Sequence, residues 1–239
     1  MHLKDQVAVI TGASGALGTV VVMDALAHGM KVVSTYQDEG RQQKFLSKVG
    51  DLGTNLTSLK VDVTSEDQVR RLFEQAFQTH GRLDVLLNIV GGYRGGHEVQ
   101  DTPLEEWEGL MRLNLLSAFL CCREALRYMV PRNHGRIVNV SARPAIERRY
   151  RAKGAAYAVS KAGVLVLTEA IAEEVKKLDI NINAVLPSTI DTQENRDKMP
   201  QSDFSRWVPP AEISKVILHL VSDDAKPTSG ASVLVYGKA

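Results

Sequence analysis

The chain has 239 residues, of which 44% are apolar and 24% charged, so it is long enough to bury a sizeable core within one α/β domain. The formal net charge is only +1, which gives no basic stripe for nucleic acid or an anionic membrane, and we expect neither as a partner. Two adjacent cysteines, Cys121 and Cys122, offer neither a disulfide framework nor metal-ligand spacing, which indicates a reduced, cytoplasmic protein without a metal site.

The first segment of the chain predicts a strand, a glycine-rich turn, a helix and a second strand. Residues 7–10 form a β-branched apolar run that stops at Thr11-Gly12-Ala13-Ser14-Gly15-Ala16-Leu17-Gly18. A helical pattern continues to His28, and a strand follows over residues 31–35. The glycines permit a tight turn, so a pyrophosphate can lie against the helix amino terminus, although an ordinary βα turn is the alternative.

The same alternation continues along the chain without a linker-like change in composition. Further strands are predicted at residues 56–63, 85–88, 136–140, 181–186 and 232–236, and helices at residues 65–79, 104–129, 157–177 and 211–221. This order favours a single Rossmann-type α/β domain over residues 1–239, with a doubly wound, parallel seven-stranded sheet and helices on both faces. We find no signal core and no apolar run near membrane-spanning length.

Ligands of such sheets bind beyond the carboxyl ends of the strands, and we expect the substrate site at that edge. Residues at or just after the predicted strand ends are Gly12, Asp62, Asn88, Ser141 and Pro187. Taken singly, Asp62, Asn88 and Asn114 are equally well explained as caps of turns or strand ends.

Tyr157 and Lys161 stand four residues apart at the start of a predicted helix. This spacing stacks the phenol and the ammonium on one face, about one turn apart. A neighbouring cation favours the phenolate, so we expect Lys161 to lower the pKa of Tyr157 and let it exchange a proton with a carbonyl or an alcohol. Taken alone, the spacing more often belongs to a solvated helix face with a packed tyrosine.

The ordered motifs along the chain resemble the short-chain dehydrogenase/reductase family. They are Thr11-Gly12 through Gly18, Asp62-Val63, Asn88, Asn114, Tyr157 with Lys161, and Asn183-Ala184-Val185-Leu186-Pro187. The resemblance implies an NAD(P)-dependent oxidoreductase that transfers a hydride between nicotinamide and a small carbonyl, alcohol or conjugated substrate. It implies Tyr157 as the acid/base, Lys161 as the ligand of the nicotinamide ribose, and Asn114 as support for a proton relay.

The resemblance also implies where the cofactor lies, with Asp62 and Val63 near the adenine and with Ile190 and Thr192 near the carboxamide. The implied cofactor-binding residues are Gly12, Ser14, Gly15, Ala16, Leu17, Gly18, Tyr36, Asp62, Val63, Asn88, Gly91, Tyr157, Lys161, Pro187, Ile190 and Thr192. Relatives are dimers and tetramers, which implies a homodimer or homotetramer paired through the apolar helices around Cys121 and Val164. A buried face within one chain explains those helices as well.

Two departures from the family pattern concern the nucleotide. Ala16 stands where a glycine is usual, and the remaining glycines keep a spacing that still suits a pyrophosphate. Tyr36 stands where members that prefer NAD carry an acidic residue for the ribose, while Asp38 comes two residues late and Arg41 is near. We therefore favour NADP(H) slightly over NAD(H).

A third departure concerns the substrate. Ala142 stands where the family has its substrate-binding serine, one residue past Ser141. Neighbouring strand residues point to opposite faces, so we expect Ser141, the fourth catalytic candidate, to miss a carbonyl held by Tyr157 unless the strand ends or bulges there. A site without that serine suits an electron-poor acceptor.

Two stretches, residues 91–96 and residues 186–207, resemble the dihydropteridine reductases more closely, which implies a quinonoid dihydropterin as substrate.

The basic run between Arg143 and Lys153 is either solvated loop surface or a site for an anionic substrate. A non-catalytic dinucleotide sensor would not need both Tyr157 and Lys161. An epimerase or dehydratase of a longer branch would carry an added substrate domain.

Overall fold

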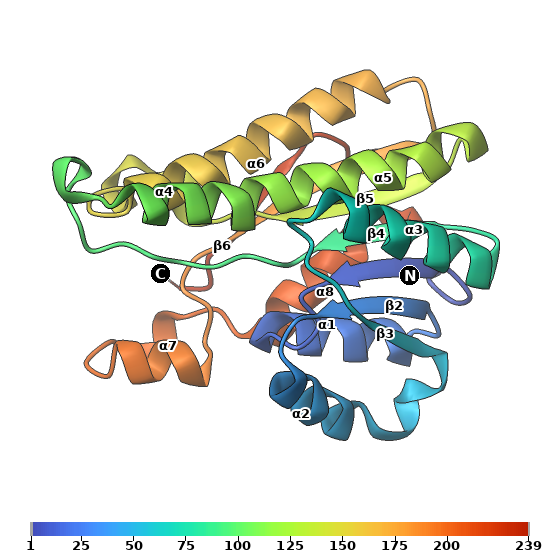
Figure 1. The fold of residues 1–239 in the computed structure, drawn as a ribbon, viewed down its shortest axis with the longest axis horizontal. Coiled ribbons are helices and arrows are strands. Elements are labelled where there is room, and N and C mark those ends of the chain that lie inside the picture. The colour runs from blue at the N-terminus through green and yellow to red at the C-terminus, as the bar shows by residue number, and fades with distance from the viewer. Residues whose placement is uncertain (1, 239) are drawn as a thin grey trace.

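The computed structural model describes residues 2–238, and a seven-stranded parallel sheet runs through it in the order β3-β2-β1-β4-β5-β6-β7 (Figure 1). The strands are β1 (Val7–Thr11), β2 (Lys31–Tyr36), β3 (Leu56–Lys60), β4 (Val85–Asn88), β5 (Gly135–Val140), β6 (Ile180–Pro187) and β7 (Ser232–Val235). The helices are α1 (Ala16–Ala27), α2 (Glu39–Val49), α3 (Glu66–His80), α4 (Leu104–Leu110), α5 (Ser117–Arg132), α6 (Ala155–Glu174), α7 (Gln193–Lys198) and α8 (Pro210–Leu220). The doubly wound parallel fold predicted from the sequence is confirmed.

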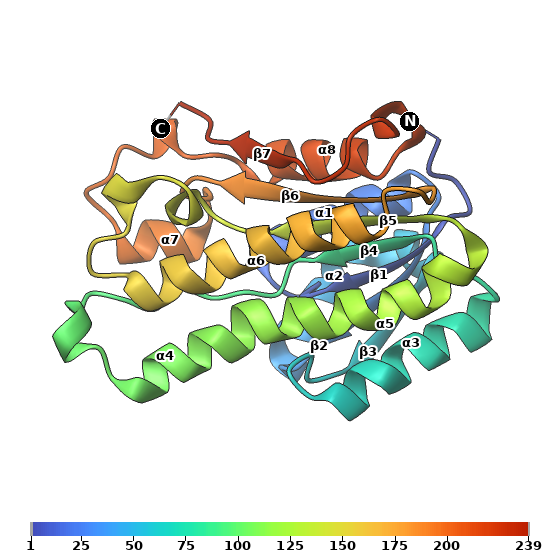
Figure 2. The same ribbon diagram turned by 90° about the horizontal axis from the view of Figure 1, so that it is seen from above.

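Helices cover both faces of the sheet, with α3, α5 and α6 on one side and α1, α2 and α8 on the other (Figures 1 and 2). Side chains alternate between these layers along each strand. In β1, Ala8 and Ile10 pack into the cluster that holds α1 and α8, whereas Val9 packs into the cluster that holds α3 and α5. Because both faces are buried, the strands read as continuous apolar runs rather than as alternating ones.

The helix predicted over residues 104–129 is interrupted in a way that matters for the site. α4 ends at Leu110, a π-helical turn covers Met111–Leu116, and α5 begins at Ser117. Asn114 lies in this turn. A π-turn widens the helix by one residue and redirects its side chains, and it occurs often at functional sites. Apolar periodicity does not reveal it.

The expectation that no apolar run approaches membrane-spanning length is wrong for α6. By length and composition alone this helix could cross a membrane. It instead packs against β6, α4 and the π-turn Met111–Leu116, and buries Val164 and Leu165 there. It therefore has the contacts of a core helix of the sheet.

Candidate active site

The glycine turn after β1 has the geometry that a pyrophosphate needs. Gly12 has φ = +75°, a conformation that favours glycine, and a Cβ on Gly18 would collide with the Gly12 carbonyl oxygen. α1 begins after Gly15, which has no side chain to cap it, so its first N–H groups point outward with the positive end of the helix dipole. The turn, which includes Ser14, Ala16 and Leu17, therefore fits a dinucleotide phosphate.

The carboxylates that follow β2 and β3 form hydrogen bonds with residues close to them in sequence. Asp38 caps α2 by accepting a hydrogen bond from the Arg41 N–H at 2.7 Å. Asp62 accepts hydrogen bonds from the backbone N–H and the hydroxyl of Thr64 at 2.9 and 2.8 Å, so it caps a turn, and Val63 is buried. The carboxylate of Asp38 is thus committed to its own helix, and Tyr36 ends β2 without an acidic partner beside it in sequence.

Asn88 turns its side chain into the core, and its expected place along the cofactor cleft stays a prediction. Its Nδ2 donates a hydrogen bond to Asn139 Oδ1 at 2.8 Å, and Asn139 Nδ2 donates to Thr168 Oγ1 at 2.9 Å. Cys122 adjoins the same pair, and burial raises the pKa of its thiol to about 12. These buried amides join β4 and β5 to α6, because each needs a partner once it is removed from water.

Lys161 is buried, and its Nζ donates a hydrogen bond to the Val140 carbonyl oxygen at the end of β5, at 2.8 Å. Burial lowers the pKa of Lys161 to about 8. The loop after β4 passes directly above it: a Cβ on Gly91 would stand 2.8 Å from Lys161 Nζ and 3.1 Å from Asn114 Oδ1. The ammonium thus lies beside the loop backbone at the carboxyl edge of the sheet.

The expected lowering of the Tyr157 pKa by Lys161 is wrong. Burial raises the pKa of the Tyr157 phenol, and the neighbouring Tyr93 raises it further. The four-residue spacing does put Lys161 on the same face of α6, but its ammonium reaches toward the sheet and bonds to Val140. Tyr157 is therefore held as a neutral phenol, the form that donates a proton.

Asn114 is fully buried and joins the loop after β4 to α6. Its Oδ1 accepts a hydrogen bond from the Gly92 N–H at 2.9 Å, and its Nδ2 donates to the Gly92 carbonyl oxygen at 3.1 Å. The same Nδ2 donates to Ser160 Oγ at 3.0 Å. Asn114 makes these contacts from within the π-turn, a kind of turn that is frequent at functional sites.

Ser141 does not present its hydroxyl to a substrate. Its Oγ donates a hydrogen bond to the Lys161 carbonyl oxygen at 2.8 Å, and only 2% of the residue is exposed. The catalytic role expected for Ser141 stays a prediction that turnover of a Ser141 variant tests. At Ala142, the position of the expected serine, only a methyl group is present, and it is also buried.

Arg143 is not a surface residue of the basic loop. Its guanidinium carbon lies 4.2 Å from the ring centroid of Tyr150 and 4.4 Å from that of Tyr236, and its Nε donates to Glu147 at 3.1 Å. It thereby joins the loop before α6 to the end of the chain through cation–π contacts. Of the other basic residues, Arg151 donates to the Pro144 and Ala145 carbonyl oxygens, and Arg148 is exposed.

The segment after β6 is ordered by its own side chains. Thr192 caps α7 by accepting from the Asn195 N–H at 3.1 Å, and Asn195 Nδ2 donates to the Ile190 carbonyl oxygen at 2.8 Å. Ile190 also forms an isolated parallel bridge with Val208. Pro187 ends β6 and is buried, so this segment starts from a fixed point at the carboxyl edge.

Tyr93 belongs to the site although sequence reasoning gave it no role. Its ring meets that of Tyr157 edge to face, with centroids 5.0 Å apart and an interplanar angle of 84°. It lies in the glycine-rich loop, whose composition indicates mobility and does not reveal what its aromatic residue contacts. Arg143 was unpredictable for a similar reason, because its partner Tyr236 is remote in sequence.

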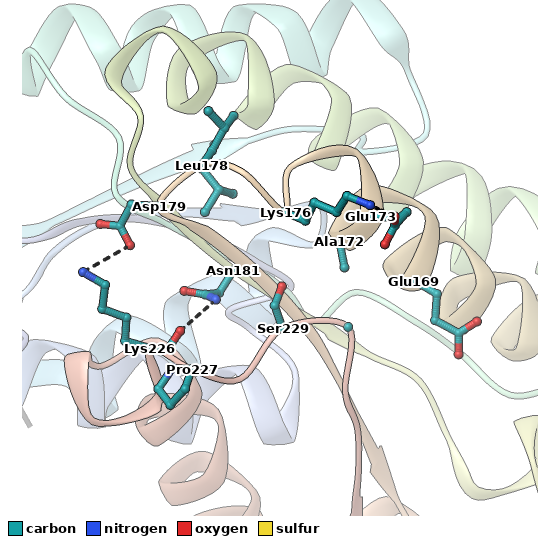
Figure 3. A pocket seen from close by; sticks show the side chains of 12 residues that line it. Glu169, Ala172, Glu173, Lys176, Leu178, Asp179, Asn181, Lys226, Pro227 and Ser229 are labelled. Carbon is teal, nitrogen blue, oxygen red and sulfur yellow. Dashed lines mark hydrogen bonds and ion pairs between the residues drawn. The ribbon is translucent and has the colours of Figure 1, made fainter.

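A pocket of about 670 Å³ lies at the opposite edge of the sheet, between the end of α6 and the start of β6 (Figure 3). Its charges are largely paired, Lys226 with Asp179 at 3.8 Å and Lys176 with Glu173. Glu173 follows Tyr157 by 16 residues along α6, which places the two about 24 Å apart. This pocket therefore takes no part in chemistry at Tyr157.

Comparison with known proteins gives consistent matches along the chain. The family described as short chain dehydrogenase matches residues 6–203. A 3-oxoacyl-[acyl-carrier-protein] reductase FabG of Thermotoga maritima is 29% identical, covering 99% of this chain and 98% of the relative, and a 3-oxoacyl-[acyl-carrier-protein] reductase of Synechocystis sp. is 30% identical, covering 93% and 92%. The crystal structure of gox2181 superposes with a TM-score of 0.91 at 26% identity, covering 97% of this chain and 94% of that one.

Proposed function

The chain belongs to the short-chain dehydrogenase family and is an NAD(P)-dependent oxidoreductase acting by hydride transfer, and from that premise we propose that it reduces electron-poor conjugated carbonyl compounds, with Tyr157 as the proton donor. The proposal rests on two features, the raised pKa of the Tyr157 phenol and the buried alanine at residue 142. Such a site offers a proton at the substrate oxygen and no serine hydroxyl beside it.

In the proposed mechanism each residue has one task at the carboxyl edge. The nicotinamide, when bound, supplies the hydride. The Tyr157 hydroxyl donates its proton to the substrate oxygen, and burial keeps that proton in place beforehand. Lys161 holds a positive charge beside the Gly91 backbone, where a ribose hydroxyl can reach it. Asn114 fixes the loop that contains Gly91. The glycine turn binds the pyrophosphate.

The substrate preference follows from the number of hydrogen bonds that the site donates to the substrate oxygen. A missing oxyanion donor costs roughly a hundredfold in turnover on a substrate that depends on it. A conjugated or quinonoid acceptor depends on it less, because its own π-system spreads the developing charge. Quinonoid dihydropterins fall in this class, and the glycine-rich loop at residues 91–96 supports them as a second candidate.

For the cofactor we propose NADP(H) over NAD(H). Asp38 supports this choice because its carboxylate caps α2, leaving no acidic side chain at Tyr36 to hold a ribose 2′-hydroxyl. Arg41, exposed on the first turn of α2, is the donor proposed for a 2′-phosphate. The remaining cofactor contacts are proposed at the turn Gly12–Gly18, with Val63 at the adenine and Ile190 and Thr192 at the carboxamide.

We propose a homodimer or homotetramer that pairs through the outer faces of α5 and α6. Cys121 and Val164, around which such pairing was expected, are buried within the chain, so they belong to the intrachain core. Phe119, Val159 and Val166 remain 41%, 47% and 64% exposed on those helices and support the pairing instead. Light scattering of the purified protein measures the assembly size.

The function is tested by crossing NADPH and NADH with three acceptors: 9,10-phenanthrenequinone, 2,3-butanedione and cyclohexanone. We expect NADPH to bind more tightly by fluorescence titration, and both diones to be reduced with a higher kcat/KM than cyclohexanone. A quinonoid dihydropterin is added as a fourth acceptor for the second candidate. Preferential turnover of cyclohexanone would contradict the proposed substrate class, and tighter binding of NADH would contradict the cofactor choice.

A further inference from the structure

The ring of Tyr93 contacts the ring of Tyr157 and is largely exposed to solvent. It meets the Tyr157 ring edge to face at 5.0 Å, and yet 64% of Tyr93 is exposed. A tyrosine that keeps most of its surface in water adds little to the core, so stability does not explain its place. Its position beside the proton donor requires another explanation.

Glycines lie next to the Tyr93 ring. A Cβ on Gly95 would stand 2.8 Å from Tyr93 Oη and 2.7 Å from the Lys153 carbonyl oxygen, and one on Gly154 would stand 3.8 Å from Tyr93 Cε2. A larger residue at Gly95 would displace the ring or the backbone of Lys153. The absence of a side chain at Gly95 therefore leaves room for the ring, whereas the 3.8 Å at Gly154 is an ordinary contact distance.

The loop that carries Tyr93 is tied down on both sides of it. Asn114 bonds to both the N–H and the carbonyl oxygen of Gly92, and the Gly96 N–H donates to the Lys153 carbonyl oxygen at 2.6 Å. Tyr93 is thus placed before a substrate arrives, which reduces the ordering cost of binding.

We propose that Tyr93 determines substrate specificity, its free ring surface being the wall against which a planar conjugated acceptor lies while its oxygen meets Tyr157. This inference rests on the proposed role of Tyr157 as proton donor. Flat π-systems gain from stacked or edge contacts with a ring, by about two- to tenfold in affinity, whereas a small aliphatic carbonyl has no such surface.

The test compares two vicinal diones, planar 9,10-phenanthrenequinone and small 2,3-butanedione, in the wild type, Tyr93→Phe and Tyr93→Leu with NADPH. We expect the ratio of their kcat/KM values to fall by about fivefold or more in Tyr93→Leu, mainly through KM for the quinone, and to be retained in Tyr93→Phe. An unchanged ratio in Tyr93→Leu, or an equal fall in Tyr93→Phe, overturns the inference. NADPH titration confirms that each variant is folded.

Binding without turnover supplies the second measurement. Phenanthrenequinone is titrated calorimetrically in the presence of NADP⁺, where no hydride is available, and we expect a several-fold weaker Kd for Tyr93→Leu than for the wild type. Equal Kd values, or no binding by the wild type, overturn the role of Tyr93. Tyr157→Phe is assayed in parallel: if it retains turnover of both diones, the proposed proton donor fails, whatever the Tyr93 ratio shows.

Discussion

At the scale of single residues, Lys161 and Ser141 make different contacts from those that their positions in the sequence suggest. Lys161 bonds to the Val140 carbonyl oxygen and not to Tyr157, and Ser141 bonds to the Lys161 carbonyl oxygen. Both contacts join α6 to the end of β5, so the catalytic helix is fixed to the sheet by polar groups at its site end.

Lys161 should make stability depend on pH. Its folded pKa of about 8 lies below the ordinary value of 10.5, so between these values the unfolded chain binds the extra proton and stability rises with pH. Below pH 8 the buried charge costs roughly 3 kcal/mol. We expect Lys161→Met to raise the Tm at pH 7, with a gain that shrinks from pH 8 to 10.5. A gain that grows over this interval in calorimetric scans would show that the ammonium is not destabilised by burial.

Ser141 should matter more for the fold than for turnover. Ser141→Ala removes the side-chain hydrogen bond to the Lys161 carbonyl oxygen, which costs about 0.5–1.5 kcal/mol in the free energy of unfolding. We expect kcat on phenanthrenequinone to fall by less than about tenfold, since an oxyanion donor would cost roughly a hundredfold or more. A hundredfold loss, with the fold intact by circular dichroism, would make Ser141 the family serine.

Ala142→Ser is the matching gain-of-function variant. It restores a hydroxyl at the position where the family carries one, so we expect the kcat/KM for cyclohexanone to rise relative to that for the diones. No change in this ratio would mean that residue 142 does not face the substrate oxygen.

At the scale of elements, the loop after β4 depends on close approach of its backbone to the site. A Cβ on Gly91 would stand 2.8 Å from Lys161 Nζ, so Gly91→Ala should displace the ammonium or the loop and lower kcat by at least about tenfold. Gly53→Ala is the control, because its nearest side-chain contact, at 3.6 Å, is an ordinary one remote from Tyr157 in sequence. Equal kcat values for the two variants would show that the approach at Gly91 is not needed.

The elements also show where sequence reasoning succeeds. Strands β1, β4 and β5 were predictable because each contains a short apolar run, and such runs between predicted helices are typical of buried parallel strands. The π-turn Met111–Leu116, which contains Asn114, was not predictable, because it leaves the apolar pattern intact. α2 was missed although Gln42, Phe45 and Val49 share one buried face, a helical spacing that the charged residues around them obscure.

The residues of the candidate site were easier to predict from the sequence than the partners that they contact. Tyr157, Lys161 and Asn114 were identified by pattern. Lys161 and Asn114 meet at the Gly91–Gly92 backbone, and Tyr157 contacts Tyr93 of the same loop. Their partners were not predictable, since Val140, Gly92 and Tyr93 are set by how β4, β5 and α6 meet. The pKa of Tyr157 is an example. The four-residue spacing indicated that a neighbouring charge would lower this pKa, whereas burial raises it.

At the scale of the whole molecule, we propose that the sheet and its two helix layers unfold as one domain. Trp207 is 9% exposed and reports on the segment after β6, while Trp107, 39% exposed, is replaced by phenylalanine to remove its signal. We expect the fluorescence of Trp207 and the far-ultraviolet circular dichroism to change at one midpoint in urea. Separate midpoints would indicate that the segment after β6 unfolds independently.

The central claim is that Tyr157 donates the proton, and Tyr157→Phe tests it most directly because only the hydroxyl is removed. Turnover of phenanthrenequinone and NADPH binding are measured on the same preparation of wild type and variant. We predict that kcat falls by about a hundredfold or more, the usual contribution of a general acid, while the Kd for NADPH changes by no more than about threefold. Near-normal turnover with normal NADPH binding would contradict the account.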